Sequence, residues 1–130
     1  MRALLIIPLF TVGALAIAAI ILAASGVHVN KLDPLAAAIV GAVAGVLGVA
    51  PILWLRPRDQ TSAVPPALIG TVLHMASAMA MGIALLASGA VGDRARLGYW
   101  LLGGYWVSLI VTVVQLRRLV LAAPIAKAEK

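Results

Sequence analysis

Few side chains in the apolar part of this sequence could do chemistry. His74 is the one residue of the predicted helices that belongs to a type titrating near neutral pH, and it falls close to the middle of an apolar run. An ionisable group at that depth in a membrane is a functional hypothesis by default. The interpretation that we favour is a neutral histidine, hydrogen-bonded to Thr71, Ser77 or a backbone carbonyl of a neighbouring helix.

The other polar side chains of the apolar runs are hydroxyls and one amide, which usually bond to the backbone of their own helix or reach the head groups. They are Thr71, Ser77, Ser108, Thr112 and Gln115. The chain has no cysteine, and no carboxylate pair, metal-ligand cluster, phosphate-binding loop or Ser/His/Asp set occurs in or near these runs. We therefore expect no catalytic residue, no metal site and no cofactor, and we expect that the protein is not an enzyme.

Long apolar segments must position these residues. Of the 130 residues, 64% are hydrophobic and 11% are charged, which is more apolar surface than a soluble domain of this length can bury. The segments lack an amphipathic period, and each is long enough to cross a hydrocarbon core of about 30 Å. We predict one all-α integral membrane domain over residues 1–130, with transmembrane helices at 3–24, 34–55, 65–90 and 97–123.

The links between these segments are short, which predicts four transmembrane helices in an up-down-up-down arrangement. The first segment is longer than the apolar core of a signal peptide, so we interpret it as a membrane helix. Seven basic residues flank one side of the predicted bundle: Arg2, Arg56, Arg58, Arg117, Arg118, Lys127 and Lys130. Three flank the other: Lys31, Arg94 and Arg96. By the positive-inside rule, both termini are expected in the cytoplasm.

The ends of the segments carry residues typical of the membrane interface. These predicted lipid-interface residues are Trp54, Arg56, Arg58, Tyr99, Trp100, Arg117 and Arg118. The net charge of +6 is therefore better explained by anionic lipid head groups than by a nucleic acid. Asp33 is expected to be the N-cap of the second helix, with Pro34 at the first helical position. Tyr105 and Trp106 lie deeper and are expected to pack between helices.

Small residues recur on two of the predicted helices. Gly41 and Gly45 form a Gly-x-x-x-Gly motif with Gly48 one turn on, and the third helix has alanines at 76, 80 and 84. Helices associate in membranes by close packing, so such faces mark contact surfaces. Contact within the chain and contact with another protein or another copy both remain open from the sequence.

Several of these residues together resemble the ATP synthase protein I family. The similarity lies in Asp33-Pro34 and the glycine-rich run after it, in Pro51, and in an arginine exit. Gly70-Thr71-Val72-Leu73-His74 is similar to a Gly-Glu-x-x-Lys pattern of that family, and Trp106-Val107 through Val114-Gln115 is similar to its Trp…Val-Gln ending. The resemblance spans about residues 33 to 124.

The resemblance implies a multi-pass protein of the bacterial cytoplasmic (inner) membrane that assists assembly of the c-subunit ring of F-type ATP synthase by helix packing. The partner-binding residues would be Gly41, Gly45, Gly48, Gly70, His74, Ala76, Ala80 and Ala84. The alternatives are a small oligomeric channel or carrier for Mg²⁺ or Ca²⁺, and an accessory subunit of another membrane complex. Thr71 stands where the family has an acidic residue, which weakens the cation-transport hypothesis.

Overall fold

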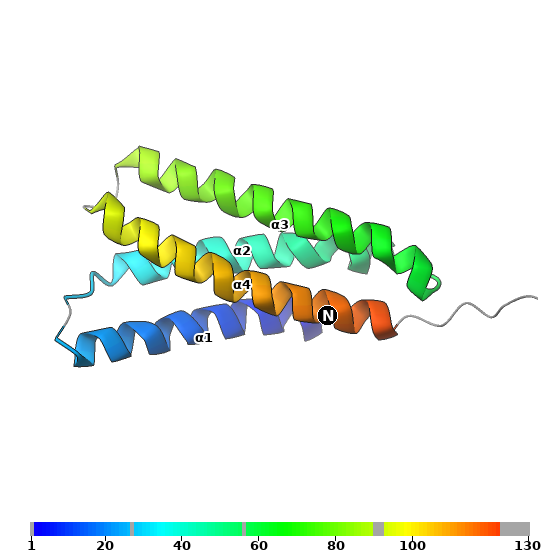
Figure 1. The fold of residues 1–130 in the computed structure, drawn as a ribbon, viewed down its shortest axis with the longest axis horizontal. Helices are drawn as coiled ribbons and strands as arrows, with labels where there is room; N and C mark the ends of the chain where they lie inside the picture. Colours follow the sequence, from blue (N-terminus) through cyan, green and yellow to red (C-terminus); the bar gives the residue numbers. More distant parts are fainter. Residues whose placement is uncertain (1, 27, 56, 90–92, 123–130) are drawn as a thin grey trace, which may run out of the picture.

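The computed structural model describes residues 2–26, 28–55, 57–89 and 93–122, and this part of the chain is almost entirely helical. Its helices are α1 (Arg2–Ala24), α2 (Leu32–Leu55), α3 (Gln60–Ser88) and α4 (Arg94–Ala122) (Figure 1). All four are long and apolar enough to cross a membrane. The chain is therefore an all-α, multi-pass membrane protein, as the hydrophobic runs predicted.

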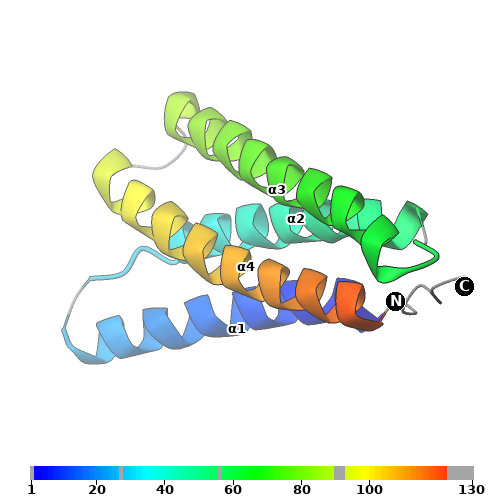
Figure 2. The same cartoon turned by 45° about the vertical axis from the view of Figure 1, so that its right-hand side comes forward.

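The helices do not form a square bundle. α2 and α4 contact each other and make a central pair, and both α1 and α3 contact each member of this pair. Between α1 and α3 the described residues make no contact, because these two helices lie on opposite flanks (Figures 1 and 2). α2 and α4 thus have three neighbours each, whereas α1 and α3 have two.

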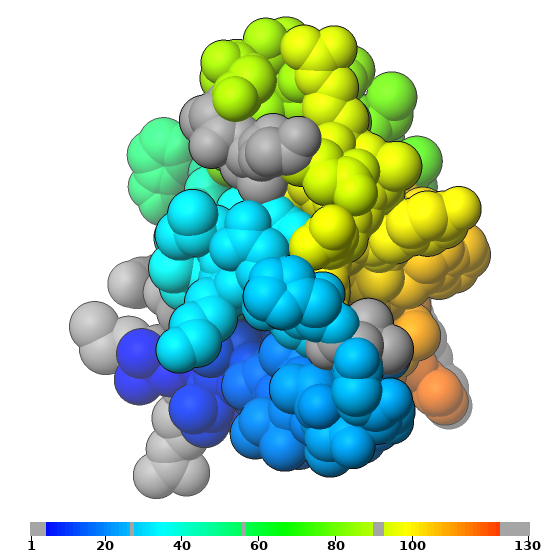
Figure 3. Space-filling model, turned by 90° about the vertical axis from the view of Figure 1, so that its left-hand side faces the viewer, coloured from blue at the N-terminus to red at the C-terminus, as the bar shows by residue number. Residues whose placement is uncertain are grey.

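The two ends of the bundle can be told apart by which helices begin there. We call the end at which α1 ends and α2 and α4 begin the distal end, and the opposite end the proximal end (Figure 1). Figure 3 looks onto the distal end, where the link after α1 lies across the space between α1 and the start of α4. At the proximal end α2 ends and α3 begins.

The start of α2 differs from the sequence prediction. The helix begins at Leu32, whose N–H donates to Asn30 Oδ1 at 3.2 Å, and the Asp33 N–H donates to the Asn30 carbonyl at 3.1 Å. Asp33 therefore lies within the first turn, with its side chain 1% exposed, and is not the N-cap. Asn30 caps the N-terminus of α2 instead, because its side-chain oxygen accepts a hydrogen bond from a free N–H of the first turn.

Aspartates do begin the other two connected helices. At α3, the Ser62 N–H donates to Asp59 Oδ1 at 2.6 Å and the Asp59 N–H donates to Ser62 Oγ at 3.1 Å, which is a capping box. This box starts α3 at Gln60, before the predicted start at residue 65, and leaves Pro65 and Pro66 inside the helix. At α4, Asp93 Oδ1 accepts from the N–H groups of Ala95 and Arg96 at 3.0 and 3.2 Å.

Apolar contacts gather in two clusters near the ends of the bundle. The proximal cluster contains Ile7, Val49, Ile52, Ala63 and Leu116. The distal cluster contains Leu15, Ala37 and Ala38, with Trp100 and Leu101 packed against them. Between the two clusters, the interior is made of glycines and polar side chains, and this middle layer holds most of the residues that the sequence singled out.

Candidate functional site: the buried polar cluster and the alanine face

The glycine face of α2, made of Gly41, Gly45 and Gly48, is buried inside the chain. A Cβ added at Gly41 would lie 2.9 Å from Thr11 Cγ2 of α1, and one added at Gly48 would lie 3.0 Å from His74 Cβ of α3. At Gly45, the added atom would meet Ile7 of α1. The glycine face is therefore covered by the chain's own helices, and the expectation that it faces a partner does not hold for the folded monomer.

Gly70 is the residue at which α2 and α3 approach most closely among the glycine contacts. A Cβ at this position would collide with the carbonyl oxygen of Gly48. No side chain can yield there, because the obstacle is backbone. Gly70 is thus a crossing point inside the chain, and its expected role in binding a partner is replaced by helix packing.

Polar side chains from three helices surround the glycine face. We call them the buried polar cluster: Thr11, His74, Ser108, Thr112 and Gln115, all of them buried. Ser108 Oγ donates to the Gly41 carbonyl at 2.6 Å, a bond between α4 and α2 that closes over 67 residues of sequence. Thr11 Oγ1 donates to the Ile7 carbonyl of its own helix at 2.9 Å. The missing side chain at Gly41 is what lets the Ser108 hydroxyl reach the backbone of α2.

Two members of the cluster have fully buried polar atoms without a hydrogen bond among the described residues. They are Thr112, through Oγ1, and His74, through both Nδ1 and Nε2. The backbone of Ala44 faces the His74 ring, and the Tyr105 ring packs on it with 5.7 Å between centroids. Buried polar atoms without partners carry a desolvation cost, so this junction of α2, α3 and α4 has unused hydrogen-bonding capacity.

His74 is 0% exposed, which decides how it can act. A carboxylate on another protein could not reach its ring without separating α3 from α2. The structure therefore does not support a direct hydrogen bond from His74 to a partner in the packed chain. Its predicted partners Thr71 and Ser77 do not bond to the His74 ring. Thr71 Oγ1 donates to the Ala67 carbonyl at 3.1 Å, and Ser77 Oγ donates to the backbone carbonyls of Leu73 at 2.7 Å and His74 at 3.1 Å.

The alanine face of α3, made of Ala76, Ala80 and Ala84, has the opposite character. All three residues are exposed. α3 presents His74 and Ala78 to the interior, and the alanine face lies on another side of the same helix. Of the partner-binding residues expected from the sequence, these three remain on the outer surface of the described chain.

The predicted interface residues lie at the helix ends, as expected. Trp54 is 88% exposed at the end of α2, and Tyr99 is 78% exposed near the start of α4. Arg58, Arg117 and Arg118 are also exposed, and Trp100 is half-buried, whereas Arg56 lies outside the described residues. Trp106, expected to pack between helices, is 57% exposed instead, because it lies on the outer face of α4, and Tyr105 beside it faces His74.

Sequence reasoning missed one buried carboxyl. Asp33 begins the inward-facing side of α2 that continues through Ala37 and Gly41, and its Oδ1 has no hydrogen bond among the described residues. The spacing of four residues from Asp33 to Ala37 and Gly41 was the available signal. Within the described chain, no three His, Cys, Asp or Glu residues group closely enough to hold a metal ion.

Comparison with protein-family models, with curated proteins and with solved structures found no match for this chain. The resemblance to the ATP synthase protein I family thus rests on the sequence motifs alone.

Proposed function

We propose that this protein is a non-enzymatic packing partner that binds helices of other membrane proteins within the bilayer through the alanine face of α3. One observation carries the proposal: the glycine contact surface is used up inside the chain, while Ala76, Ala80 and Ala84 are left exposed. Small exposed residues let a second helix approach closely, and close approach is the main source of helix affinity in lipid.

The proposed partner is the c subunit of F-type ATP synthase, with the chain acting as an assembly factor for the c-ring. The family resemblance supports this choice, since c-subunit hairpins are themselves rich in small residues. The proposed location is the bacterial cytoplasmic membrane, with both termini in the cytoplasm. The division of basic residues between the two predicted sides, seven against three, supports this orientation.

The test is recovery of c subunits with the tagged chain from native membranes. We expect Ala80→Leu to reduce recovery by about tenfold, as expected if about 1.4 kcal/mol of packing is lost. Ala16→Leu is the matched control, because Ala16 is equally an exposed alanine but lies on α1. Equal recovery with the Ala80→Leu and Ala16→Leu variants would show that the alanine face does not bind the partner.

A cation carrier is the second candidate, and the buried polar cluster favours it. The cluster buries the side-chain oxygen atoms of Ser108, Thr112 and Gln115 inside the chain, and oxygen is the ligand that Mg²⁺ and Ca²⁺ prefer. This function predicts metal-dependent flux in proteoliposomes that Thr112→Val abolishes. Wild-type liposomes without flux would leave the packing function as the single candidate.

A further inference from the structure

A groove separates α1 from α4 in the distal half of the molecule. Figure 2 shows the two helices close together at the proximal end and farther apart toward the distal end. The groove has a volume of about 440 Å³. Burial along α1 decreases toward the distal end. Ile7 and Thr11 are fully buried, whereas Ala18 is half-buried and Leu22 is exposed.

The walls of the groove are apolar. α1 contributes Ala14, Leu15, Ala18 and Leu22, and α4 contributes Trp100, Gly103 and Val107. From Arg96 to Val107 the groove follows α4 for about 16 Å, at 1.5 Å per residue. That length is about half of a hydrocarbon core of about 30 Å, which is the depth of one leaflet.

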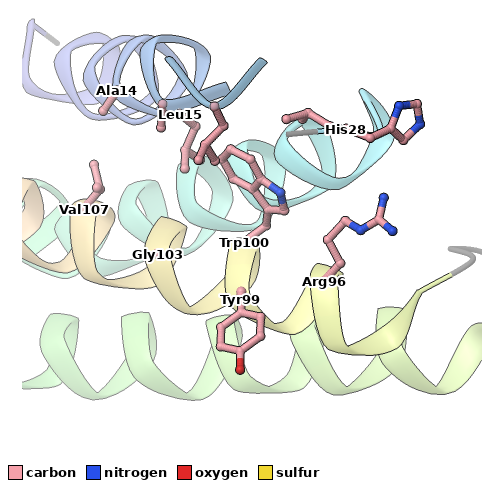
Figure 4. A pocket seen from close by; sticks show the side chains of 11 residues that line it. Ala14, Leu15, His28, Arg96, Tyr99, Trp100, Gly103 and Val107 are labelled. Atoms are coloured by element: carbon pink, nitrogen blue, oxygen red, sulfur yellow. The ribbon is translucent and has the colours of Figure 1, made fainter. Parts of the chain in front are cut away.

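Donor groups gather at the distal mouth of this groove. The Arg96 guanidinium, the His28 imidazole and the indole nitrogen of Trp100 lie toward the same end (Figure 4). Arg96 Nη2 lies 3.3 Å from Asp93 Oδ2 in an exposed ion pair, which engages one of the five N–H donors of the guanidinium. The Asp33 carboxyl is buried in α2, and Lys31 and Arg94 add positive charge at this end.

We propose that this α1–α4 groove binds an anionic phospholipid, with one acyl chain between the two helices and the phosphate at Arg96 and His28. Charge complementarity selects an anion, and the leaflet-deep apolar walls select an acyl chain.

Trp100 provides a probe inside the groove. Replacing Trp54 and Trp106, which are exposed on other surfaces, by phenylalanine leaves Trp100 as the single tryptophan. The experiment reconstitutes this chain in phosphatidylcholine bilayers with small fractions of chain-brominated phosphatidylglycerol or chain-brominated phosphatidylcholine, and measures fluorescence quenching. We expect half-maximal quenching at about a fivefold lower fraction of the anionic lipid, as about 1 kcal/mol of attraction per basic residue implies.

Two variants separate a built site from ordinary lipid contact. Arg96→Gln should remove the fivefold preference while quenching continues. Gly103→Phe should fill the groove and reduce quenching by both lipids, and the fold should tolerate it because a Cβ at Gly103 meets nothing within 4 Å. Gly98→Phe is the matched control: its Cβ also meets open space, but Gly98 lines a different groove, between α3 and α4.

The outcomes decide the proposal. Anionic preference that is lost with Arg96→Gln and quenching that is lost with Gly103→Phe, but not with Gly98→Phe, establish the site. Equal quenching by both lipids in every variant means annular lipid only and overturns it. Trp100 shielded from both lipids, in a sample that is dimeric by cross-linking, means that a second copy covers the groove and also overturns it.

Discussion

Two sets of glycines in this molecule have the same residue type and opposite surroundings. At Gly48 and Gly70, α2 and α3 cross so closely that an added Cβ at Gly70 would strike backbone. At Gly98 and Gly103, on the distal half of α4, an added Cβ would meet nothing within 4 Å. The first pair marks the tightest of the glycine contacts in the described chain, and the second pair lines grooves on its surface.

The difference shows what a small residue does in lipid. Where a second helix is present, the missing side chain permits backbone approach and bonds such as that from Ser108 to the Gly41 carbonyl. Where no helix is present, the same missing side chain leaves a surface hollow that lipid or a partner can enter. A glycine face is therefore a contact surface only if the topology brings a helix to it.

The largest effect is expected at the crossing point. Gly70→Ala places a Cβ against the Gly48 carbonyl, so the two helices must separate, and we expect the free energy of unfolding to fall by about 3 kcal/mol. The measurement is unfolding in mixed micelles, followed by circular dichroism. An unchanged midpoint would show that α2 and α3 are not in backbone contact at this position.

The bond between α4 and α2 is expected to have the next largest effect. Ser108→Ala removes the donor to the Gly41 carbonyl and should lower the free energy of unfolding by about 1 kcal/mol. Ser77→Ala is the control, because Ser77 bonds only to carbonyls of its own helix, Leu73 and His74. Equal losses in the two variants would contradict a role for Ser108 in joining α4 to α2.

The open glycines should respond in the opposite direction. Gly103→Ala adds a methyl group in open space and removes backbone freedom from the unfolded chain, so we expect a gain of about 0.5 to 1 kcal/mol. The same unfolding assay measures it. A loss of stability would mean that the distal half of α4 is packed more tightly than the groove indicates.

The smallest effect concerns the cap of α3. Bonds from the Ser62 N–H, and next from its hydroxyl, lower the pKa of Asp59 below its ordinary 3.8. The folded chain thus binds this proton less tightly than the unfolded chain does. The contribution of the cap to the free energy of unfolding is complete at a pH above the pKa that Asp59 has in the unfolded chain. It is lost as the pH falls through the lower pKa that Asp59 has in the folded chain.

The measurement for the cap is thermal unfolding between pH 5 and pH 2, with Asp59→Asn as the control. The amide keeps an acceptor oxygen but cannot titrate, so this variant should show a smaller fall in midpoint over that range. Between pH 6 and 8 the two proteins should show the same pH dependence. Parallel curves down to pH 2 would contradict the capping role.

Much of the fold could be predicted because a helix that crosses the bilayer needs an apolar segment of a minimum length. The apolar runs gave all four helices. The largest error was the start of α3, where the Asp59–Ser62 capping box begins the helix before Pro65-Pro66. The exposed positions of Trp54 and Tyr99 near helix ends also followed from their place at the ends of the runs. These features depend on local sequence and on the thickness of the bilayer.

The candidate site was harder to predict, because membrane helices are apolar on both their packed and their lipid-facing sides. Gly45 and Ala80 both belong to small-residue motifs, yet one is buried and the other exposed. The inward position of Asp33 and the outward position of Trp106 depend on the neighbours that α4 and α2 find. These positions follow from the pairing of α2 with α4, which cannot be predicted from the sequence of either helix alone.

The position of α4 also has a consequence for biosynthesis. A ribosome delivers α2 to the membrane long before α4, yet Ser108, Thr112 and Gly104 of α4 cover much of the glycine face of α2. While α3 is being made, α1 covers part of that face through Ile7 and Thr11, and the part that α4 will cover is open to lipid or to another helix. The nascent chain therefore exposes this part of its glycine face just before α4 is added. A chain truncated before α4 would bind helices that the complete protein does not bind.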